Sequence, residues 1–165
     1  MLKVEEVNAL ERHRFTDIFA PVFEHSPWIA ARTAAKRPFR DRGEFLAALC
    51  ETVMKANNDE KLCLIRAHPD LVGREVLTSE SQQEQASAGL GQLSAAEAAQ
   101  FRKYNDDYRE KFGFPFIICA RLNKKEAILE AFPRRLANSR EKEIETALAE
   151  IFKIAELRLQ DLVAP

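Results

Sequence analysis

The residues with the clearest capacity for chemistry lie in one short stretch near the middle of the chain, Arg-Ala-His-Pro-Asp-Leu-Val-Gly over residues 66–73. Histidine can both take and give a proton near neutral pH. Pro69 cannot continue a helix and biases His68 towards extended backbone. We therefore expect the imidazole to lie at a helix end rather than on a smooth helix face. The alternative is a structural histidine bonded to a backbone carbonyl.

A second stretch carries three different polar groups at helical spacing. Ser81, Glu84 and Gln85 stand at positions i, i+3 and i+4, which share one face of a helix. Ala88 continues that face with a small side chain and leaves room beside it. A hydroxyl, a carboxylate and an amide together suit a small polar ligand. The alternative, a solvated polar face, fits these residues equally well at this point.

A third stretch, Phe-Gly-Phe-Pro-Phe-Ile-Ile-Cys-Ala over residues 112–120, is apolar enough for the core. Periodicity does not separate a buried extended segment from a buried helical turn here. An extended segment would leave backbone N–H and C=O groups that need partners. A ligand could supply some of them, and we expect this stretch and the second one to converge on His68.

The bulk properties indicate one globular domain over residues 1–165. Charged residues make up 31% of the chain but the net charge is only −1, which is typical of solvated helix faces and gives no basic excess for nucleic acid. Ala, Leu, Glu, Lys and Arg outnumber β-branched residues, and this favours helix over sheet. No apolar run approaches the roughly 20 residues that cross a bilayer, so we expect no membrane span.

Three cysteines, Cys50, Cys63 and Cys119, are an odd number at long spacings among apolar residues. Neither a disulfide framework nor a zinc site fits them. We expect buried free thiols in a reducing compartment, and the N-terminus lacks an apolar signal core, so we expect a cytoplasmic protein. No metal-ligand cluster and no phosphate-binding glycine loop occurs. If the protein is an enzyme, we expect it to work by proton transfer without a metal.

Capping residues and apolar spacing predict a compact all-α domain. Ser139 is expected to cap the last and longest helix. Its apolar stripe includes Ile144, Leu148, Ile151 and Leu159. The expected helix starts are Ser26-Pro27, Asp41, Ser79, Ser94, Asn123 and Ser139, with Gly113 ending the helix that Ser94 begins.

Taken together, the motifs resemble the OHCU decarboxylase family, where OHCU is 2-oxo-4-hydroxy-4-carboxy-5-ureidoimidazoline. This family converts OHCU to (S)-allantoin in urate (purine) degradation. The resemblance covers nearly the whole chain. It is carried by Ser26-Pro27-Trp28, His68-Pro69-Asp70-Leu71, Ser81-x-x-Glu84-Gln85-x-x-Ala88-Gly89-Leu90, Phe112-Gly113-Phe114-Pro115-Phe116 and Arg135-Leu136-Ala137-Asn138.

The resemblance implies a family-specific all-helical fold, a homodimer, and a carboxy-lyase (decarboxylase) that is cofactor-independent. By position, His68 matches the proton donor of the family. The connection from Gly73 to Thr78 is shorter than in animal relatives, and Pro133 falls where a continuous helix is expected. The positions that match substrate-binding segments are Pro69, Ser81, Gln82, Gln83, Glu84, Gln85, Phe116, Ile117, Ile118, Cys119 and Ala120.

The residue types agree with that reaction. The substrate carries its own electron sink, a carbon–nitrogen double bond, so what remains is to deliver one proton and to remove another. A histidine and a carboxylate suit these steps, and we expect His68 and Glu84 to be the catalytic pair. A non-catalytic all-α module that binds a partner is the alternative from another class. A third possibility is that this protein is a family member that acts on a related ureido substrate.

Overall fold

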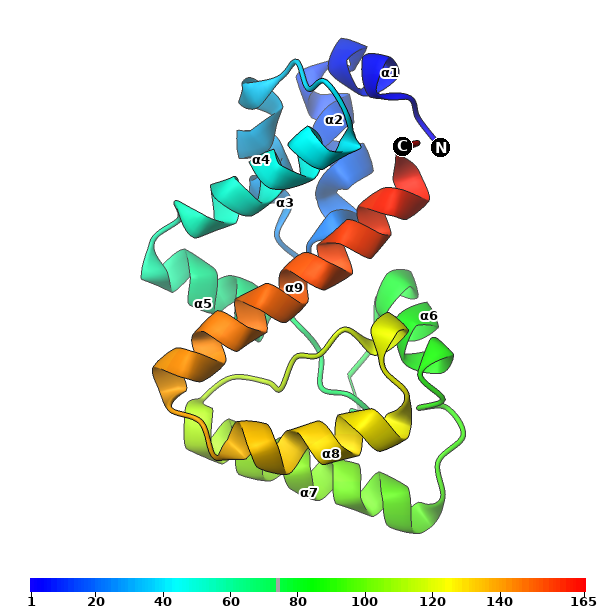
Figure 1. Cartoon of the computed structure of the whole chain (residues 1–165), viewed down its shortest axis with the longest axis vertical. Helices are drawn as coiled ribbons and strands as arrows, with labels where there is room; N and C mark the ends of the chain where they lie inside the picture. Colours follow the sequence, from blue (N-terminus) through cyan, green and yellow to red (C-terminus); the bar gives the residue numbers. More distant parts are fainter. Residues whose placement is uncertain (74) are drawn as a thin grey trace. The chain divides into compact units, whose positions relative to one another are not determined.

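The computed structural model describes residues 1–73 and 75–165, and its regular structure over these residues is helical (Figure 1). A single-residue parallel bridge joins Leu2 to Val163. Contacts divide the chain into two compact units: the first unit is residues 1–67 and 152–165, and the second unit is residues 68–151. The all-α class expected from composition is confirmed. None of the described helices combines the length and apolarity that a membrane span requires.

The first unit is built on a cluster of phenylalanine rings. Phe15, Phe19 and Phe45 are fully buried, with ring centroids 4.8–5.3 Å apart. A buried ion pair of 2.9 Å ties Arg158 to Glu24. The helices of this unit are α1 (Val4–Ala9), α2 (Arg12–Phe19), η1 (Ala20–Val22), α3 (Pro27–Thr33), η2 (Ala34–Lys36), α4 (Arg42–Met54), α5 (Asn58–Arg66) and the C-terminal part of α9 (Arg140–Leu162).

The second unit packs its helices against an irregular apolar segment. Helices α7 and α8 lie side by side (Figure 1). The Phe116 ring stacks on Phe132 at 3.8 Å, and Tyr108 meets Phe116 edge-on at 5.3 Å. Residues 114–119 are neither helix nor strand. Of the two alternatives left open for this stretch, a helical turn is therefore not observed over these residues. The helices are α6 (Ser79–Ser87), α7 (Ala95–Phe112), η3 (Ala120–Leu122), α8 (Lys125–Leu136) and the N-terminal part of α9.

Most helix boundaries follow the predicted caps. The side-chain oxygens of Asp41, Ser94 and Ser139 each accept a hydrogen bond from the backbone N–H three residues later, at 2.8, 3.1 and 3.1 Å. Such bonds satisfy N–H groups that have no partner inside the helix. Gly113 ends α7 with φ of +77°, the left-handed conformation in which a side chain is strained. Local sequence therefore determines these boundaries.

Two predicted caps are wrong. Helix α6 begins at Ser79, but its cap is Thr78, whose hydroxyl accepts from the backbone N–H three residues later at 3.3 Å. Helix α8 has Lys124 at its cap position, without a side-chain cap bond. The side chain of Asn123 instead donates to the carbonyl of Cys119 at 2.9 Å. A polar side chain near a helix start can bond either the helix or the preceding segment, and the preceding segment holds Asn123 here.

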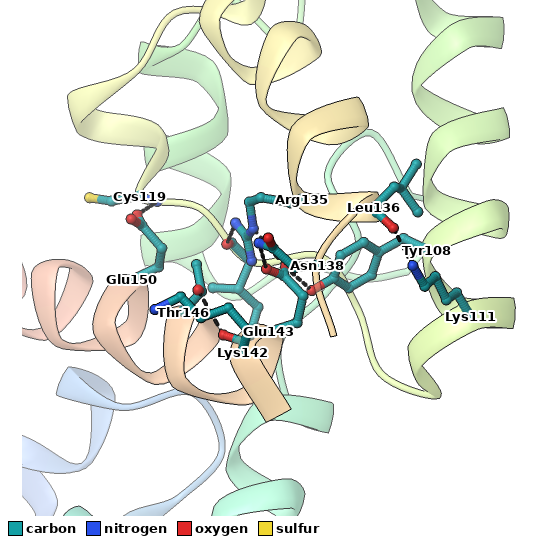
Figure 2. A network of polar contacts seen from close by, with 11 residues as sticks. Tyr108, Lys111, Cys119, Arg135, Leu136, Asn138, Lys142, Glu143, Thr146 and Glu150 are labelled. Atoms are coloured by element: carbon teal, nitrogen blue, oxygen red, sulfur yellow. Dashed lines mark hydrogen bonds and ion pairs between the residues drawn. The ribbon is translucent and has the colours of Figure 1, made fainter. Parts of the chain in front are cut away.

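A buried polar network joins the irregular segment to α7, α8 and α9 (Figure 2). Arg135 donates to the carboxylate of Glu143 at 2.8 Å and also to the carbonyl of Ile117. Tyr108 and Asn138 donate to the same carboxylate. Glu143 is 0% exposed and Arg135 is 4% exposed. Burial, followed by the bond to Glu143, raises the pKa of Tyr108, so its hydroxyl remains a donor.

Replacing Gly113 by alanine should lower the free energy of unfolding by about 1–2 kcal/mol, because an L side chain in the left-handed region is strained even where space is open. Urea denaturation measures this change. Gly91→Ala is the matched control, since its added Cβ also meets open space but its φ is not positive. Equal effects at both positions would contradict the conformational explanation.

Arg135→Met should lower the free energy of unfolding by about 3–5 kcal/mol, because it leaves the buried Glu143 carboxylate without its cation. The double change Arg135→Met, Glu143→Met should cost less than the sum of the two single changes. Arg134→Met, at the exposed neighbouring position, should stay within about 0.5 kcal/mol of the parent. Additive single and double effects in denaturant titrations would show that the two charges are not coupled.

Candidate functional site

His68 lies directly after the end of a helix, as its sequence context predicts. Helix α5 ends at Arg66, with Ala67 as its C-cap, and the proline after His68 stops any continuation. The histidine residue is 6% exposed, and Pro69 is half-buried. The imidazole is therefore buried at the start of an irregular segment, and His68 itself is not part of a helix.

The segment after His68 forms a tight turn, which we call the His68 turn (residues 68–73). The backbone N–H of Gly73 donates to the carbonyl of Asp70 at 3.3 Å. Val72, inside that turn, has φ of +57°. A β-branched residue in this region is uncommon and strained. The turn therefore has a defined shape that its own sequence does not favour.

Side chains from α6 and α7 hold the turn by its backbone. The amide of Gln85 accepts from the N–H of Val72 at 3.1 Å and donates to the carbonyl of Asp70 at 3.3 Å. Asn105 donates to the carbonyl of Leu71 at 2.7 Å. The two bonds of Gln85 use half of the hydrogen-bonding capacity of its amide, since an amide offers two N–H donors and two oxygen lone pairs.

Arg109 binds the turn through a side chain, that of Asp70, and not through the backbone. Arg109 lies on α7, and its guanidinium pairs with the Asp70 carboxylate at a distance of 3.0 Å. The Asp70 side chain is largely shielded from solvent and that of Arg109 is more exposed. An ion pair of this kind positions the turn more than it stabilises the fold, because partly exposed pairs contribute little free energy.

The predicted polar face of α6 is turned towards the protein. Ser81, Gln85 and Ala88 are buried, and Glu84 is half-buried. Their shared face, inferred from the i, i+3, i+4 spacing, is thus confirmed, whereas a fully solvated face is not observed. Gln82 and Gln83 are exposed on the same helix.

The third stretch runs through the core of the second unit. The residues at 116, 117, 119 and 120 are buried and Ile118 is half-buried. The backbone N–H of Cys119 donates to the Glu150 carboxylate at 2.8 Å (Figure 2), and its carbonyl accepts from Asn123. Protein side chains therefore bond both backbone groups of Cys119, which the sequence left open to a ligand.

Helix α6 connects the three stretches. The carbonyl of Ala88, at its C-terminal end, accepts from the backbone N–H of Lys125, just beyond η3, at 3.1 Å. Burial raises the pKa of the Cys119 thiol, and the nearby carboxylates of Glu150 and Glu84 raise it further. Gln85, one residue after Glu84, holds the His68 turn. Helix α6 therefore lies beside the His68 turn through Gln85 and near the end of the third stretch through Glu84. Convergence of the third stretch on His68 itself stays a prediction.

Among the described residues, the cysteines form no disulfide and no metal-binding cluster occurs. All three cysteines are free thiols, as expected, but their expected burial is wrong for Cys63, which is exposed on α5; Cys119 is buried and Cys50 half-buried. Residues 1–73 and 75–165 contain no group of three His, Cys, Asp or Glu side chains arranged to hold a metal ion. A cavity of about 400 Å³ opens beside the turn, and its walls include Asp70, Val72 and Asn105. Its lining comes from the α7 side of the turn and not from the polar face of α6.

Sequence reasoning gave no supporting role to Asn105, Arg109, Arg135, Glu143 or Glu150, although Arg135 belongs to the motif Arg135-Leu136-Ala137-Asn138. One of them left a signal. Phe101, Asn105, Tyr108 and Phe112 form a single buried stripe at i, i+4, i+7 and i+11 along α7. A polar residue at a core position of such a stripe indicates a buried hydrogen bond. The charged residues left no such signal, because their types are equally common on solvated faces.

Comparison with known proteins agrees with this geometry. The sequence model of the OHCU decarboxylase family matches residues 8–160. A relative from Halalkalicoccus jeotgali named 2-oxo-4-hydroxy-4-carboxy-5-ureidoimidazoline decarboxylase is 44% identical over 99% of this chain and 93% of its own length.

Two solved structures share the fold. One, described as the crystal structure of (S)-allantoin synthase, superposes with a TM-score of 0.83 at 27% identity. It covers 99% of this chain, which spans about half (54%) of that longer chain. The other, OHCU decarboxylase in the presence of (S)-allantoin, gives 0.70 at 28% identity over 83% of this chain and 91% of that one. On the match to the family model and the identity to its curated members, this chain belongs to the OHCU decarboxylase family.

Proposed function

We propose that this protein decarboxylates OHCU to (S)-allantoin without a cofactor, with His68 as the proton donor and Glu84 as its catalytic partner. The observation that carries the proposal is the fixed His68 turn. A buried histidine is held through Gln85 to the same helix that presents Glu84. Family membership supports the substrate, and one solved relative is described in the presence of (S)-allantoin. Relatives that carry an enzyme name do not favour the alternative of a non-catalytic partner-binding module.

The reaction divides into two steps that need different things from the protein. When carbon dioxide leaves, the electron pair of the broken bond enters the neighbouring carbon–nitrogen double bond of the substrate. This gives an enediol-like amine with the extra charge on nitrogen. The substrate is thus its own electron sink, which is the chemistry that a cofactor supplies in many other decarboxylases. The protein has to bind the ring and leave the carboxylate free to depart.

The second step sets the configuration of the product. A proton is added to the ureido-bearing carbon and another is lost from the hydroxyl, which becomes the ring carbonyl. The ring nitrogen that took up the electron pair also gains a proton, from water, so the reaction consumes one proton overall. We assign the first transfer to the imidazolium of His68 and the second to Glu84, because general acids and bases must lie within hydrogen-bond reach of the proton. Delivery of the proton to one face only gives the (S) product.

The remaining predicted positions are proposed to bind the ring and its ureido group. Pro69 and the buried residues Ser81 and Gln85 would line one side of the substrate. Gln85 has a second function in holding the turn, so its amide has half of its hydrogen-bonding capacity for a ligand. The proposed binding residues further include Gln82, Gln83, Glu84, Phe116, Ile117, Ile118, Cys119 and Ala120.

The proposal includes the assembly and compartment that the resemblance and the cysteines suggest. Family resemblance supports a homodimer. Three free thiols suit a reducing environment, and we place the protein in the cytoplasm on that ground.

The test of the function is a coupled assay in which OHCU is made fresh from urate by a urate oxidase and a hydrolase. Added protein should speed the loss of the OHCU absorbance, and circular dichroism of the product should show (S)-allantoin. Loss of OHCU at the spontaneous rate, with racemic product, would contradict the proposal.

His68→Asn should lower kcat by about 10²–10⁴-fold with the fold intact, because it removes the proton donor and keeps a polar side chain of similar shape. Stopped-flow absorbance gives the rate, and far-ultraviolet circular dichroism checks the fold. The matched control is His13→Asn, at an exposed histidine of α2, which should keep the parent kcat. A folded His68→Asn variant within a few-fold of the parent would exclude His68 as the donor.

Glu84→Gln should mainly lower kcat, because it keeps size and hydrogen bonding but loses the carboxylate that accepts the hydroxyl proton. A carboxylate beside an imidazole raises the pKa of the imidazole. Since the donor must be protonated, the fall in rate at high pH should begin at a lower pH in the variant.

Glu80→Gln, four residues earlier on α6, is the control for this change and should alter neither kcat nor the pH profile. The measurement is kcat and KM for both variants across pH. An unchanged kcat and pH profile in Glu84→Gln would mean that His68 acts with substrate groups or water as its only partners.

A further inference from the structure

The backbone of the His68 turn adopts a conformation that its residues disfavour. Its hydrogen bond from Gly73 back to Asp70 makes Leu71 and Val72 the two central residues of a four-residue turn. The second central residue has φ of +57°, a position that glycine or asparagine usually occupies in turns of this kind. Valine is β-branched and is strained there. Without outside support, the turn would tend to relax by rotation at Val72.

Asn105 is placed to oppose that relaxation. Its side-chain nitrogen donates to the carbonyl of Leu71 at 2.7 Å, which belongs to the peptide group joining Leu71 to Val72. The N–H of Val72, on the other side of the same peptide group, donates to the side-chain oxygen of Gln85, and the two side chains come from different helices, α7 and α6. Rotation at Val72 would swing this peptide group and break both bonds.

The surroundings of Asn105 indicate that its donor group is what matters. The residue is 4% exposed, and its side-chain oxygen has no hydrogen-bond partner among the described residues. A buried carbonyl oxygen without a partner is destabilising. The bond to the Leu71 carbonyl is thus the one hydrogen bond of this amide among the described residues, and it offsets part of that penalty.

We propose that Asn105 is a positioning residue: by holding the Leu71 carbonyl it keeps Val72 in the left-handed conformation and thereby sets the position of the His68 imidazole. This inference rests on the proposed role of His68 as proton donor. Asn105 does not touch the substrate in this account and acts only through the turn. Misplacement of a catalytic group by about 1 Å typically costs on the order of 10²-fold in rate.

The experiment is a double-mutant cycle between Asn105 and Val72. Asn105→Ala should lower kcat by roughly 10–100-fold with KM changed by less than about threefold, because the proton donor lies in the turn whereas the proposed binding residues other than Pro69 lie outside it. Val72→Gly alone should stay close to the parent, since glycine takes a positive φ without strain and Val72 is only half-buried. In the double variant, Val72→Gly should restore most of the kcat that Asn105→Ala loses.

That rescue separates positioning from simple stability. If Asn105 only stabilised the fold, Asn105→Ala would lower the unfolding midpoint and leave kcat unchanged well below it, or the two changes would add without rescue. Either result would overturn the proposal. Asn8→Ala is the matched control, because the amide of Asn8 also bonds a backbone carbonyl, that of Phe39 at 2.8 Å, and its loss should leave kcat unchanged.

The outcome can be told apart from a failure of the proposed function. An active His68→Asn variant would refute the role of His68 itself. An inactive His68→Asn variant together with a fully active Asn105→Ala variant would refute only the positioning role of Asn105. Should Asn105→Ala not fold, amide hydrogen exchange of the parent protein decides: the N–H of Val72 should be protected, and exchange at the rate of an unstructured peptide would overturn the proposal.

Discussion

The second unit depends on one buried ion pair, between Arg135 and Glu143. Each charge would be strongly destabilising in the core by itself, so the two groups hold each other and the elements that carry them, α8 and α9. Tyr108 adds a bond from α7 (Figure 2), and the Nη1 atom of Arg135 donates to the carbonyl of Ile117. The pair thus fixes three helices and the apolar segment together.

The same physical constraint explains why buried polar side chains surround the site. The His68 turn and residues 114–119 are not helical, so their backbone groups lack the internal partners that a helix provides. Gln85, Asn105 and Arg135 supply bonds from neighbouring helices. An irregular backbone that long side chains hold at several points can present catalytic and binding groups in a fixed arrangement, which is what preorganisation requires.

Sequence reasoning succeeded where the determining interactions are local. The caps at Asp41, Ser94 and Ser139 and the left-handed glycine at 113 act within one helical turn, so the residues that cause them are adjacent in the chain. It failed at Asn123, whose side chain bonds the preceding segment rather than α8. Sequence reasoning could not predict the strained backbone at Val72 either, because its neighbouring residues do not favour a positive φ.

The sequence by itself determined the all-α class, most helix starts, the family, and the position of His68 at a helix end. Periodicity and capping depend on residues close together in the chain, and the family follows from the order of the motifs. Only the tertiary structure decided that Gln85 holds the turn, that Asn105 and Arg109 do so from α7, and that the backbone of residues 117–119 is bonded by Arg135, Glu150 and Asn123. These contacts join residues that lie up to 39 positions apart in the chain. A polar residue has the same local signature on a solvated face as in the core, and only the packing of helices around it selects its partner.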